Sequence, residues 1–212
     1  MRHVRHIIWS KRHWCRNRRD EEMAEKGMKT KQYIVNTAAG LFSQKGFTAV
    51  TMKDICEACE LSRGGLYRHF GSTKEIFIEV LERDENNAEE SIDQAIALGL
   101  SAKKLLDGFF QLQKNDIAYS KNRIEVAVYE FSVAHPDQKE YLEQRYHSTV
   151  KIFAKLIDYG QKNGELLEGE SIMLAEHIVI FLEGLKLSSK IIDISEDFLT
   201  KQFAILSKQL MK

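Results

Sequence analysis

Six residues between Ser62 and Phe70 have side chains that suit contact with the major groove of DNA. They are Arg63, Gly64, Gly65, Tyr67, Arg68 and His69. At helical spacing they share an outward face, because Leu66 and Phe70 form the inward one. The arginines can donate hydrogen bonds to phosphates or base edges, and the glycines let a helix approach the groove closely. The segment therefore predicts a short helix that reads DNA.

A second short helix must precede this one and hold it in place. Thr51 can cap its first amides, and Asp54 stands where the reciprocal acid of a capping box would be. Ser62 caps the reading helix, and Glu60-Leu61 forms the turn. The expected inward residues of the first helix are Ile55, Cys56 and Cys59. Thr51 and Ser62 then lie at helix starts that meet phosphates, and Lys53 can reach a phosphate or a base edge.

Two longer helices are expected on either side of this pair. Upstream, an apolar stripe begins near Lys29 and ends at Gly46, a typical helix C-cap. The residues of that stripe are Ile34, Ala38, Leu41 and Phe42. Downstream, Ser72 and Glu75 form a capping box that opens a helix extending past Asn87. Its expected inward residues are Ile76, Phe77, Val80 and Leu81.

The segment from near Lys29 to near Val80, about one quarter of the chain, resembles the DNA-binding region of the TetR family of bacterial repressors. The most specific part is Leu-Tyr-x-His-Phe followed at once by a second capping box. The matching residues are Gly46-Phe47, Thr51, Ile55, Leu61-Ser62, Gly64-Gly65-Leu66-Tyr67, His69-Phe70, Ser72 and Glu75-Ile76-Phe77. Beyond this segment, only the length and the helical texture of the chain are compatible with the family.

The resemblance implies a ligand-released repressor that binds a palindromic operator, without a cofactor and in the cytoplasm. It implies a homodimer formed through the last two helices, about 171–190 and 195–212, and a small-molecule effector that the sequence does not identify. Tyr67 and His69 match positions that touch the phosphate backbone. Lys74 stands one residue after the position of a family phosphate-binding lysine. Glu60 replaces a glycine of the turn, which costs roughly 1 kcal/mol if the residue is left-handed.

Composition and charge distribution agree with a helical DNA-binding protein of two parts. The 212 residues are 43% hydrophobic and 29% charged with a single Pro, which favours an all-α fold. The formal net charge is zero, but residues 29–83 hold 8 Lys and Arg against 6 Asp and Glu. Residues 84–212 hold 15 against 21. We therefore expect a helix-turn-helix domain at 29–80 and a helical effector-binding and dimerisation domain at 81–212.

Five helices are expected in the larger part. The first spans about Ala102 to Ser120, the second about Arg123 to Val133, and the third follows Asp137, with Glu140 as its capping partner, and ends near Asn163-Gly164. The last two are the helices at about 171–190 and 195–212. The expected inward residues of the first are Leu105, Leu106, Phe109 and Leu112, and the aromatic residues that could line either a pocket or the core are Tyr119, Tyr129, Phe109, Phe131 and Phe181.

Two other functions remain open from the residues alone. Cys56-x-x-Cys59 could support a redox protein, although packing of the two thiols is the favoured interpretation. The apolar stretch from Ile172 to Ile192 could bind a protein partner, as in a helical adaptor. Glu176, His177, Glu183 and Lys186 interrupt that stretch, which argues against a membrane span. These residues form neither a catalytic set nor a convincing metal site, so an enzyme is not expected.

Residues 1–28 form a basic extension that differs from the rest of the chain. The first 19 residues hold seven Lys and Arg and no acidic residue. One interpretation is an arm that adds phosphate contacts. The preferred hypothesis is that the extension is not native and that translation starts at Met23 or Met28.

Overall fold

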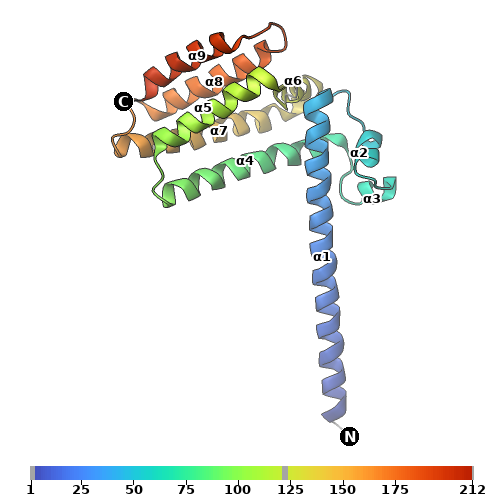
Figure 1. Cartoon of the computed structure of the whole chain (residues 1–212). Helices are drawn as coiled ribbons and strands as arrows, with labels where there is room; N and C mark the ends of the chain where they lie inside the picture. The colour runs from blue at the N-terminus through green and yellow to red at the C-terminus, as the bar shows by residue number, and fades with distance from the viewer. Residues whose placement is uncertain (1–2, 121–123, 212) are drawn as a thin grey trace.

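The computed structural model describes the backbone of residues 3–120 and 124–211, and within these ranges the side chains from Met23 onward. This part of the chain is helical and has no extended strand, which confirms the all-α class (Figure 1). The α-helices are α1 (His3–Lys45), α2 (Met52–Ala58), α3 (Arg63–Tyr67), α4 (Thr73–Ala97), α5 (Ala102–Tyr119), α6 (Ile124–Ala134), α7 (Lys139–Lys162), α8 (Ser171–Ser188) and α9 (Glu196–Leu210). A 3-10 turn, η1 (Pro136–Gln138), precedes α7.

Helix α1 is longer than predicted from the sequence. It begins at His3 rather than near Lys29, and its first half extends away from the rest of the protein in Figure 1. No proline interrupts this segment, and one glycine at Gly27 costs a helix only about 1 kcal/mol relative to alanine. The C-terminal end is as predicted: Gly46 has a φ of 82°, and its N–H donates to the carbonyl of Phe42.

The first part of the molecule, which we call the head, consists of the second half of α1 with α2, α3 and the start of α4. Its core centres on Phe42, Phe47 and Phe77, whose rings contact one another in stacked, edge-to-face and tilted arrangements. Helix α6 completes this core: Phe131 lies 4.9 Å from Phe47 and 5.0 Å from Phe77, measured between ring centroids. The hydrophobic core of the head therefore includes residues from a helix that follows much later in the chain.

The rest of α4 together with α5 to α9 forms the body. Its core lies between α5, α7, α8 and α9, and it includes Leu106, Ile157, Ile178 and Leu199, all fully buried. At Gly160 a side chain would collide with Leu166 and Ala102, at 2.6 and 2.7 Å from an added Cβ. This glycine therefore allows α7 to approach α5 closely.

Two expectations about the body are wrong. Leu112 is 68% exposed, whereas Phe110 and Ile117 are buried. Leu112 lies about 120° around α5 from Leu106 and therefore faces away from the core. Leu105 and Phe109, by contrast, pack against the core and line a cavity.

The second error concerns the start of α7. Asp137 does not cap it, because Pro136 begins a 3-10 turn that moves the start of α7 to Lys139. The carboxylate of Asp137 instead accepts a hydrogen bond from the ammonium of Lys74.

Candidate nucleic-acid interface

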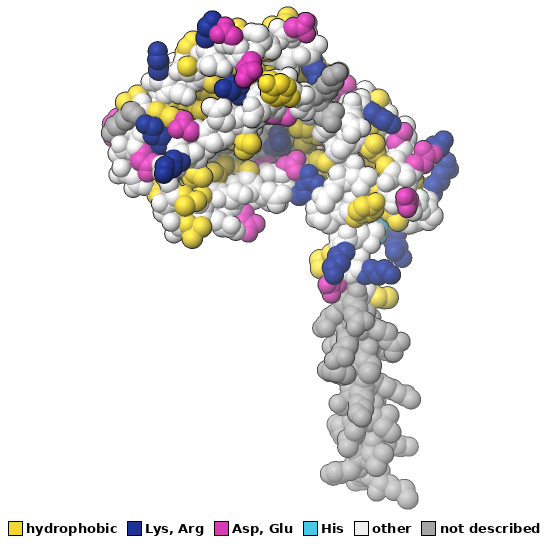
Figure 2. All heavy atoms as spheres, viewed as in Figure 1, with side chains coloured by type: hydrophobic (Ala, Val, Ile, Leu, Met, Phe, Trp, Pro, Cys, Tyr) yellow, Lys and Arg dark blue, Asp and Glu magenta, His cyan; other side chains and the backbone are white. Residues whose placement is uncertain are grey.

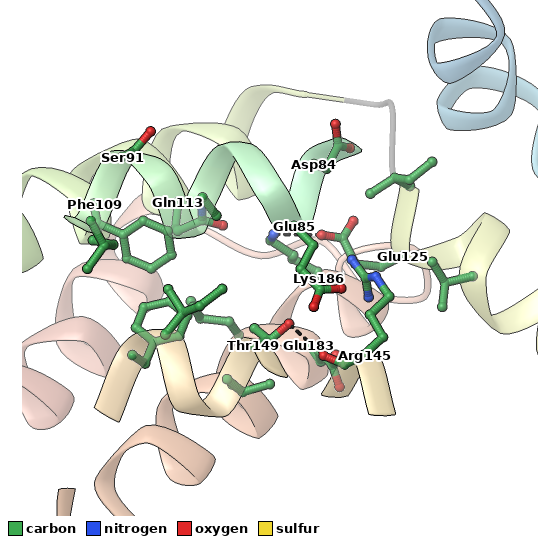
Figure 3. Close-up of a pocket in the computed structure, with 18 of the residues that line it drawn as sticks. Asp84, Glu85, Ser91, Phe109, Gln113, Glu125, Arg145, Thr149, Glu183 and Lys186 are labelled. Atoms are coloured by element: carbon green, nitrogen blue, oxygen red, sulfur yellow. Dashed lines mark hydrogen bonds and ion pairs between the residues drawn. The ribbon is translucent and has the colours of Figure 1, made fainter. Parts of the chain in front are cut away.

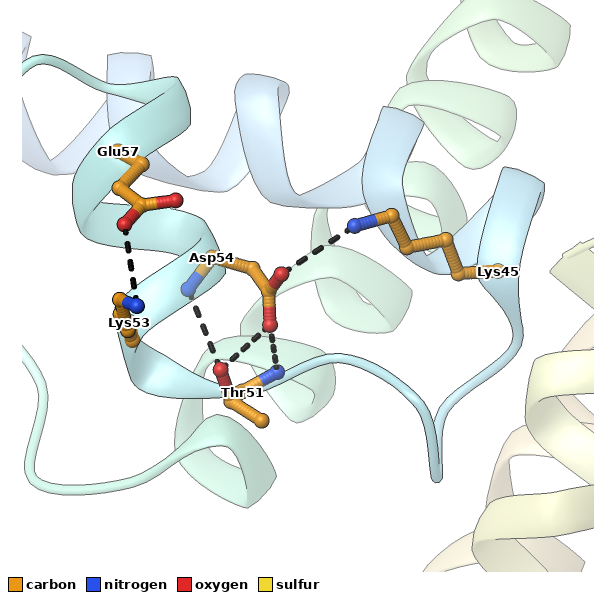
Figure 4. A network of polar contacts seen from close by, with 5 residues as sticks. All are labelled: Lys45, Thr51, Lys53, Asp54 and Glu57. Carbon is orange, nitrogen blue, oxygen red and sulfur yellow. Dashed lines mark hydrogen bonds and ion pairs between the residues drawn. The ribbon is translucent and has the colours of Figure 1, made fainter.

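The start of α2 is fixed by the predicted capping box (Figure 4). The Thr51 hydroxyl accepts from the Asp54 N–H at 3.2 Å, and the Asp54 carboxylate accepts from the Thr51 N–H at 2.9 Å. Lys45 adds a contact to the same carboxylate at 3.2 Å. Hydrogen bonds from the side chain and the backbone of Thr51, and then from Lys45, lower the pKa of Asp54 to about 2.

Lys53 lies on the exposed side of α2 and can exchange its present partner for DNA. Its ammonium is 3.6 Å from the carboxylate of Glu57, one helical turn away, and both side chains are largely exposed. An exposed pair of this kind contributes at most about 1 kcal/mol, so a phosphate can displace Glu57 at little cost.

The turn between α2 and α3 contains a left-handed residue at the position where the family usually has glycine. Glu60 has a φ of 55°, the only positive φ of a non-glycine residue in the described part of the chain. The Leu61 N–H donates to the carbonyl of Cys56 and closes the turn. Strain at Glu60 of roughly 1 kcal/mol is therefore present in this fold.

Helix α3 and the residue after it present four of the six predicted outward residues. The Ser62 hydroxyl accepts from the Gly65 N–H at 3.1 Å, and Leu66 and Phe70 are buried beneath the helix. Arg63, Gly64, Tyr67 and Arg68 are exposed, and Tyr67 retains 53% of its surface. In Figure 2, Lys and Arg side chains cluster with a few acidic ones on the outer side of this region.

The two glycines of α3 differ in what surrounds them. A Cβ added to Gly64 would meet no atom within 4 Å, so nothing in the chain requires a small residue there. A Cβ on Gly65 would lie 3.3 Å from the Ser62 hydroxyl, so Gly65 also serves the cap. The surface at Gly64 is therefore available for close approach by another molecule.

Three of the predicted contact residues are less accessible than expected. His69 is half-buried, and its Nε2 atom is enclosed without a hydrogen-bond partner among the described residues. A residue three positions after Leu66 lies only about 60° from it around a helix, so His69 borders the buried face. Gly65 is also half-buried, and the Lys74 ammonium lies 2.6 Å from Asp137. The exposed predicted contacts are Thr51, Lys53, Ser62, Arg63, Gly64, Tyr67 and Arg68.

Sequence reasoning did not identify the residues of a second site in the body. A cavity of about 710 Å³ lies between α4, α5, α6, α7 and α8 (Figure 3). Of the five aromatic candidates, Phe109 and Tyr129 line it, while Phe131 belongs to the core of the head. The lining comes from five helices far apart in the chain, so no local pattern reveals it.

The two cysteines pack in the core of the head. Cys56 and Cys59 are buried as unpaired thiols, and burial raises the pKa of Cys59. Among residues 23–120 and 124–211, no three His, Cys, Asp or Glu side chains are placed to share a metal ion. Within the same residues, none of the helices combines the length and apolar character that crossing a membrane requires.

Comparison with known proteins identifies the family of both parts. Residues 34–80 match the model for "Bacterial regulatory proteins, tetR family", and residues 105–199 match that for "Tetracyclin repressor-like, C-terminal domain". The chain is 29% identical over 135 residues to the uncharacterized HTH-type transcriptional regulator YfiR of Bacillus subtilis. That match covers 62% of this chain and 65% of the relative, slightly less than two thirds of its length. The chain is also 25% identical over 159 residues to the HTH-type transcriptional repressor KstR2 of Rhodococcus jostii. This second match covers 74% of this chain and 76% of that relative.

Solved structures share the fold at low sequence identity. The reduced form of Escherichia coli NemR aligns with a TM-score of 0.70 at 17% identity, over 86% of this chain and 98% of that one. Regulatory protein TetR from Rhodobacter sphaeroides aligns with a TM-score of 0.70 at 20% identity, over 85% and 98%. The named relatives are regulators of transcription and not enzymes. The capped helix-turn-helix, the helical body and both family matches show that the chain belongs to the TetR family of DNA-binding transcriptional regulators.

Proposed function

We propose that this regulator is a cytoplasmic repressor that binds a palindromic operator as a homodimer and leaves it when a small effector enters the body. In this proposal residues 29–80 read DNA and residues 81–212 bind the effector and the second subunit. The operator half-sites would then be about 34 Å apart or slightly more, because two α3 helices must enter successive major grooves on one side of the duplex.

The position of α6 is the observation that most supports release by an effector. One side of α6 contributes Ala127 and Phe131 to the core of the head. Its other side contributes Glu125 and Tyr129 to the lining of the cavity, and Val128 both packs against the head core and lines the cavity. A ligand that moves α6 must therefore also move residues against which the head packs. A coupling of about 1–3 kcal/mol is typical between two such sites.

A polar contact strengthens the connection between α6 and the head. The carboxylate of Glu130 accepts hydrogen bonds from the N–H and the hydroxyl of Thr48, each at 2.9 Å. Thr48 lies in the short segment that joins α1 to α2. Displacement of α6 would therefore pull directly on the segment that leads into the helix-turn-helix.

Exposed apolar side chains on the last two helices support the proposed homodimer. Both leave large apolar side chains exposed along one face: Met173 and Ile180 on α8, and Phe198 and Ile205 on α9, each between 41% and 60% exposed. A Cβ added to Gly184 would meet no atom within 4 Å, so another helix can approach closely there. An apolar surface of this kind is typical of a helix-pairing interface.

Substitution of Ile180 by Lys tests the dimer and its role together. We expect sedimentation equilibrium to give the mass of two chains for the wild type and of one chain for Ile180→Lys. Operator affinity should fall with the loss of the dimer. The control is Leu98→Lys, which changes an apolar residue that is 75% exposed at the end of α4. A monomeric wild type, or an Ile180→Lys variant that remains a dimer with full operator affinity, contradicts the proposed assembly.

A further inference from the structure

The cavity in the body has an apolar end and a charged end. At the apolar end, Phe109 contacts Phe153 with ring centroids 5.2 Å apart, and Leu105 and Leu156 lie beside them. At the other end, Figure 3 shows a group of charged side chains from α4, α6, α7 and α8: Glu85, Glu125, Arg145, Glu183 and Lys186. Its volume of about 710 Å³ is within the range of about 300–1,000 Å³ that small-molecule sites usually have.

Negative charge exceeds positive charge at the polar end. The lining includes four carboxylates, from Asp84, Glu85, Glu125 and Glu183, against the two cations Arg145 and Lys186. Lys186 is already paired with Glu125 at 2.6 Å, and both side chains are mostly buried. Asp84 is paired with Arg83, its neighbour in the chain. Arg145 is then left to balance both Glu85 and Glu183, which leaves one carboxylate in excess.

The negative charge of Glu183 is only partly compensated by its surroundings. Although Glu183 is among the exposed residues of α8, its carboxyl group borders the cavity, where loss of solvation raises its pKa. The positive charges of Arg145 and Lys186 oppose this rise in pKa, and the negative charge of Glu125 adds to it. No ion pair to Glu183 within 4 Å is found among the described side chains. A positively charged group beside Glu183 would replace the missing solvation.

Arg145 does not make the site suitable for an anion. Its Nε atom is enclosed and has no hydrogen-bond partner among the described residues, so it could donate to a ligand. However, an anion at this point would lie close to Glu183, and Glu85 and Glu125 line the same end of the cavity. Repulsion from these carboxylates would offset the attraction of a single guanidinium. A neutral acceptor on the ligand can use the Arg145 donor without this cost.

We propose that the cavity binds a hydrophobic organic cation, with its protonated nitrogen near Glu183 and Glu85 and its apolar body against Phe109 and Phe153. The proposal rests on the proposed function, because it names the chemical class of the effector. Aromatic rings on the cavity wall also suit a cation, since their faces carry partial negative charge.

Three probes with one shared apolar body and different head groups test the proposal. They are para-tert-butylbenzylamine, para-tert-butylbenzyl alcohol and para-tert-butylbenzoate, each titrated calorimetrically into the full-length protein. We expect the amine to bind most tightly. Glu183→Gln and, separately, Glu85→Gln should weaken the amine about ten- to a hundredfold and leave the alcohol unchanged, because each removes only a charge-assisted contact. Glu168→Gln, an exposed carboxylate outside the cavity, is the matched control.

Several results would overturn the proposed ligand class. These are tightest binding by the benzoate, no binding of the amine, or an equal loss of amine and alcohol affinity in Glu183→Gln. Circular dichroism of each variant excludes unfolding as the cause. Operator binding is measured on the same preparations. A protein that selects an operator but rejects the amine keeps its proposed function and loses the ligand class, whereas one that selects no operator fails the proposed function.

Discussion

Glu130→Ala should loosen the contact between α6 and the head by an amount that the structure allows us to estimate. The substitution removes the acceptor for the Thr48 N–H and hydroxyl, both at 2.9 Å. Hydrogen bonds to a charged group contribute about 1.5–3 kcal/mol each when they are shielded from water. Because Thr48 is exposed, water can replace much of the hydrogen bonding that the carboxylate supplied. We therefore expect a loss of about 1–2 kcal/mol in the free energy of unfolding.

Gly46 lies against the same carboxylate, so a substitution at Gly46 tests the same contact independently. A Cβ at Gly46 would be 2.6 Å from both carboxylate oxygens of Glu130, and Gly46 has a φ of 82°. Gly46→Ala should therefore cost about 1–2 kcal/mol in backbone strain and, in addition, displace Glu130 from Thr48. In the Glu130→Ala background only the backbone strain remains. The loss in the free energy of unfolding of the double variant should therefore be about 1–2 kcal/mol smaller than the sum of the two single losses.

Urea unfolding followed by circular dichroism measures this interaction energy. The wild type, both single variants and the double variant are compared at one chain concentration, because dissociation of a dimer would otherwise shift the midpoint. The control combines Gly46→Ala with Glu89→Ala, an exposed carboxylate on α4, for which the losses should add. Additivity within about 0.5 kcal/mol for Gly46 and Glu130 would refute the predicted contact between α6 and the head.

Three further predictions concern the core, the reading helix and the effect of acid. Gly160→Ala should lower the free energy of unfolding by about 1–3 kcal/mol, because the new methyl group would overlap Leu166; an unchanged urea midpoint argues against the close approach of α5 and α7. Arg63→Ala should relax the preference for particular bases by about 1–3 kcal/mol, whereas Tyr67→Ala should weaken binding to all sequences alike; wild-type binding by both variants rejects α3 as the reading helix. The pKa of Asp54 is lowered from 3.8 to about 2, so its contribution to stability is complete above about pH 4 and disappears as the pH falls toward 2. Asp54→Asn should remove this part of the acid dependence of unfolding. An acid titration of this variant that matches the wild type would contradict the prediction.

The helix-turn-helix could be predicted in detail because its signals are local. Thr51 with Asp54 forms the expected capping box, and Ser62 and Ser72 accept from the backbone three residues ahead. The second box differs in one respect: the Glu75 carboxylate accepts from the Gly71 N–H, one residue before the cap. Such bonds depend on residues within one turn, so the sequence contains all the information they need.

The errors arise where distant parts of the chain decide the outcome. Leu112 fits a helical stripe, but how much of that stripe is covered depends on where the other helices of the body lie, and they leave Leu112 exposed. Asp137 fits a capping pattern, yet its partner is Lys74, 63 residues away. The charged end of the cavity combines Glu85 of α4, Arg145 of α7 and Glu183 of α8, which no spacing along the sequence connects.

Selection of random duplex DNA on the purified protein, with a salt titration of the enriched site, tests the central claim most directly. A dimer that reads DNA through two α3 helices predicts an enriched motif with two-fold symmetry and half-sites about 34 Å apart or slightly more. The logarithm of its affinity should fall linearly with the logarithm of salt concentration. Absence of an enriched motif, with only weak and salt-sensitive binding, would contradict the proposal that this chain is a sequence-specific dimeric repressor.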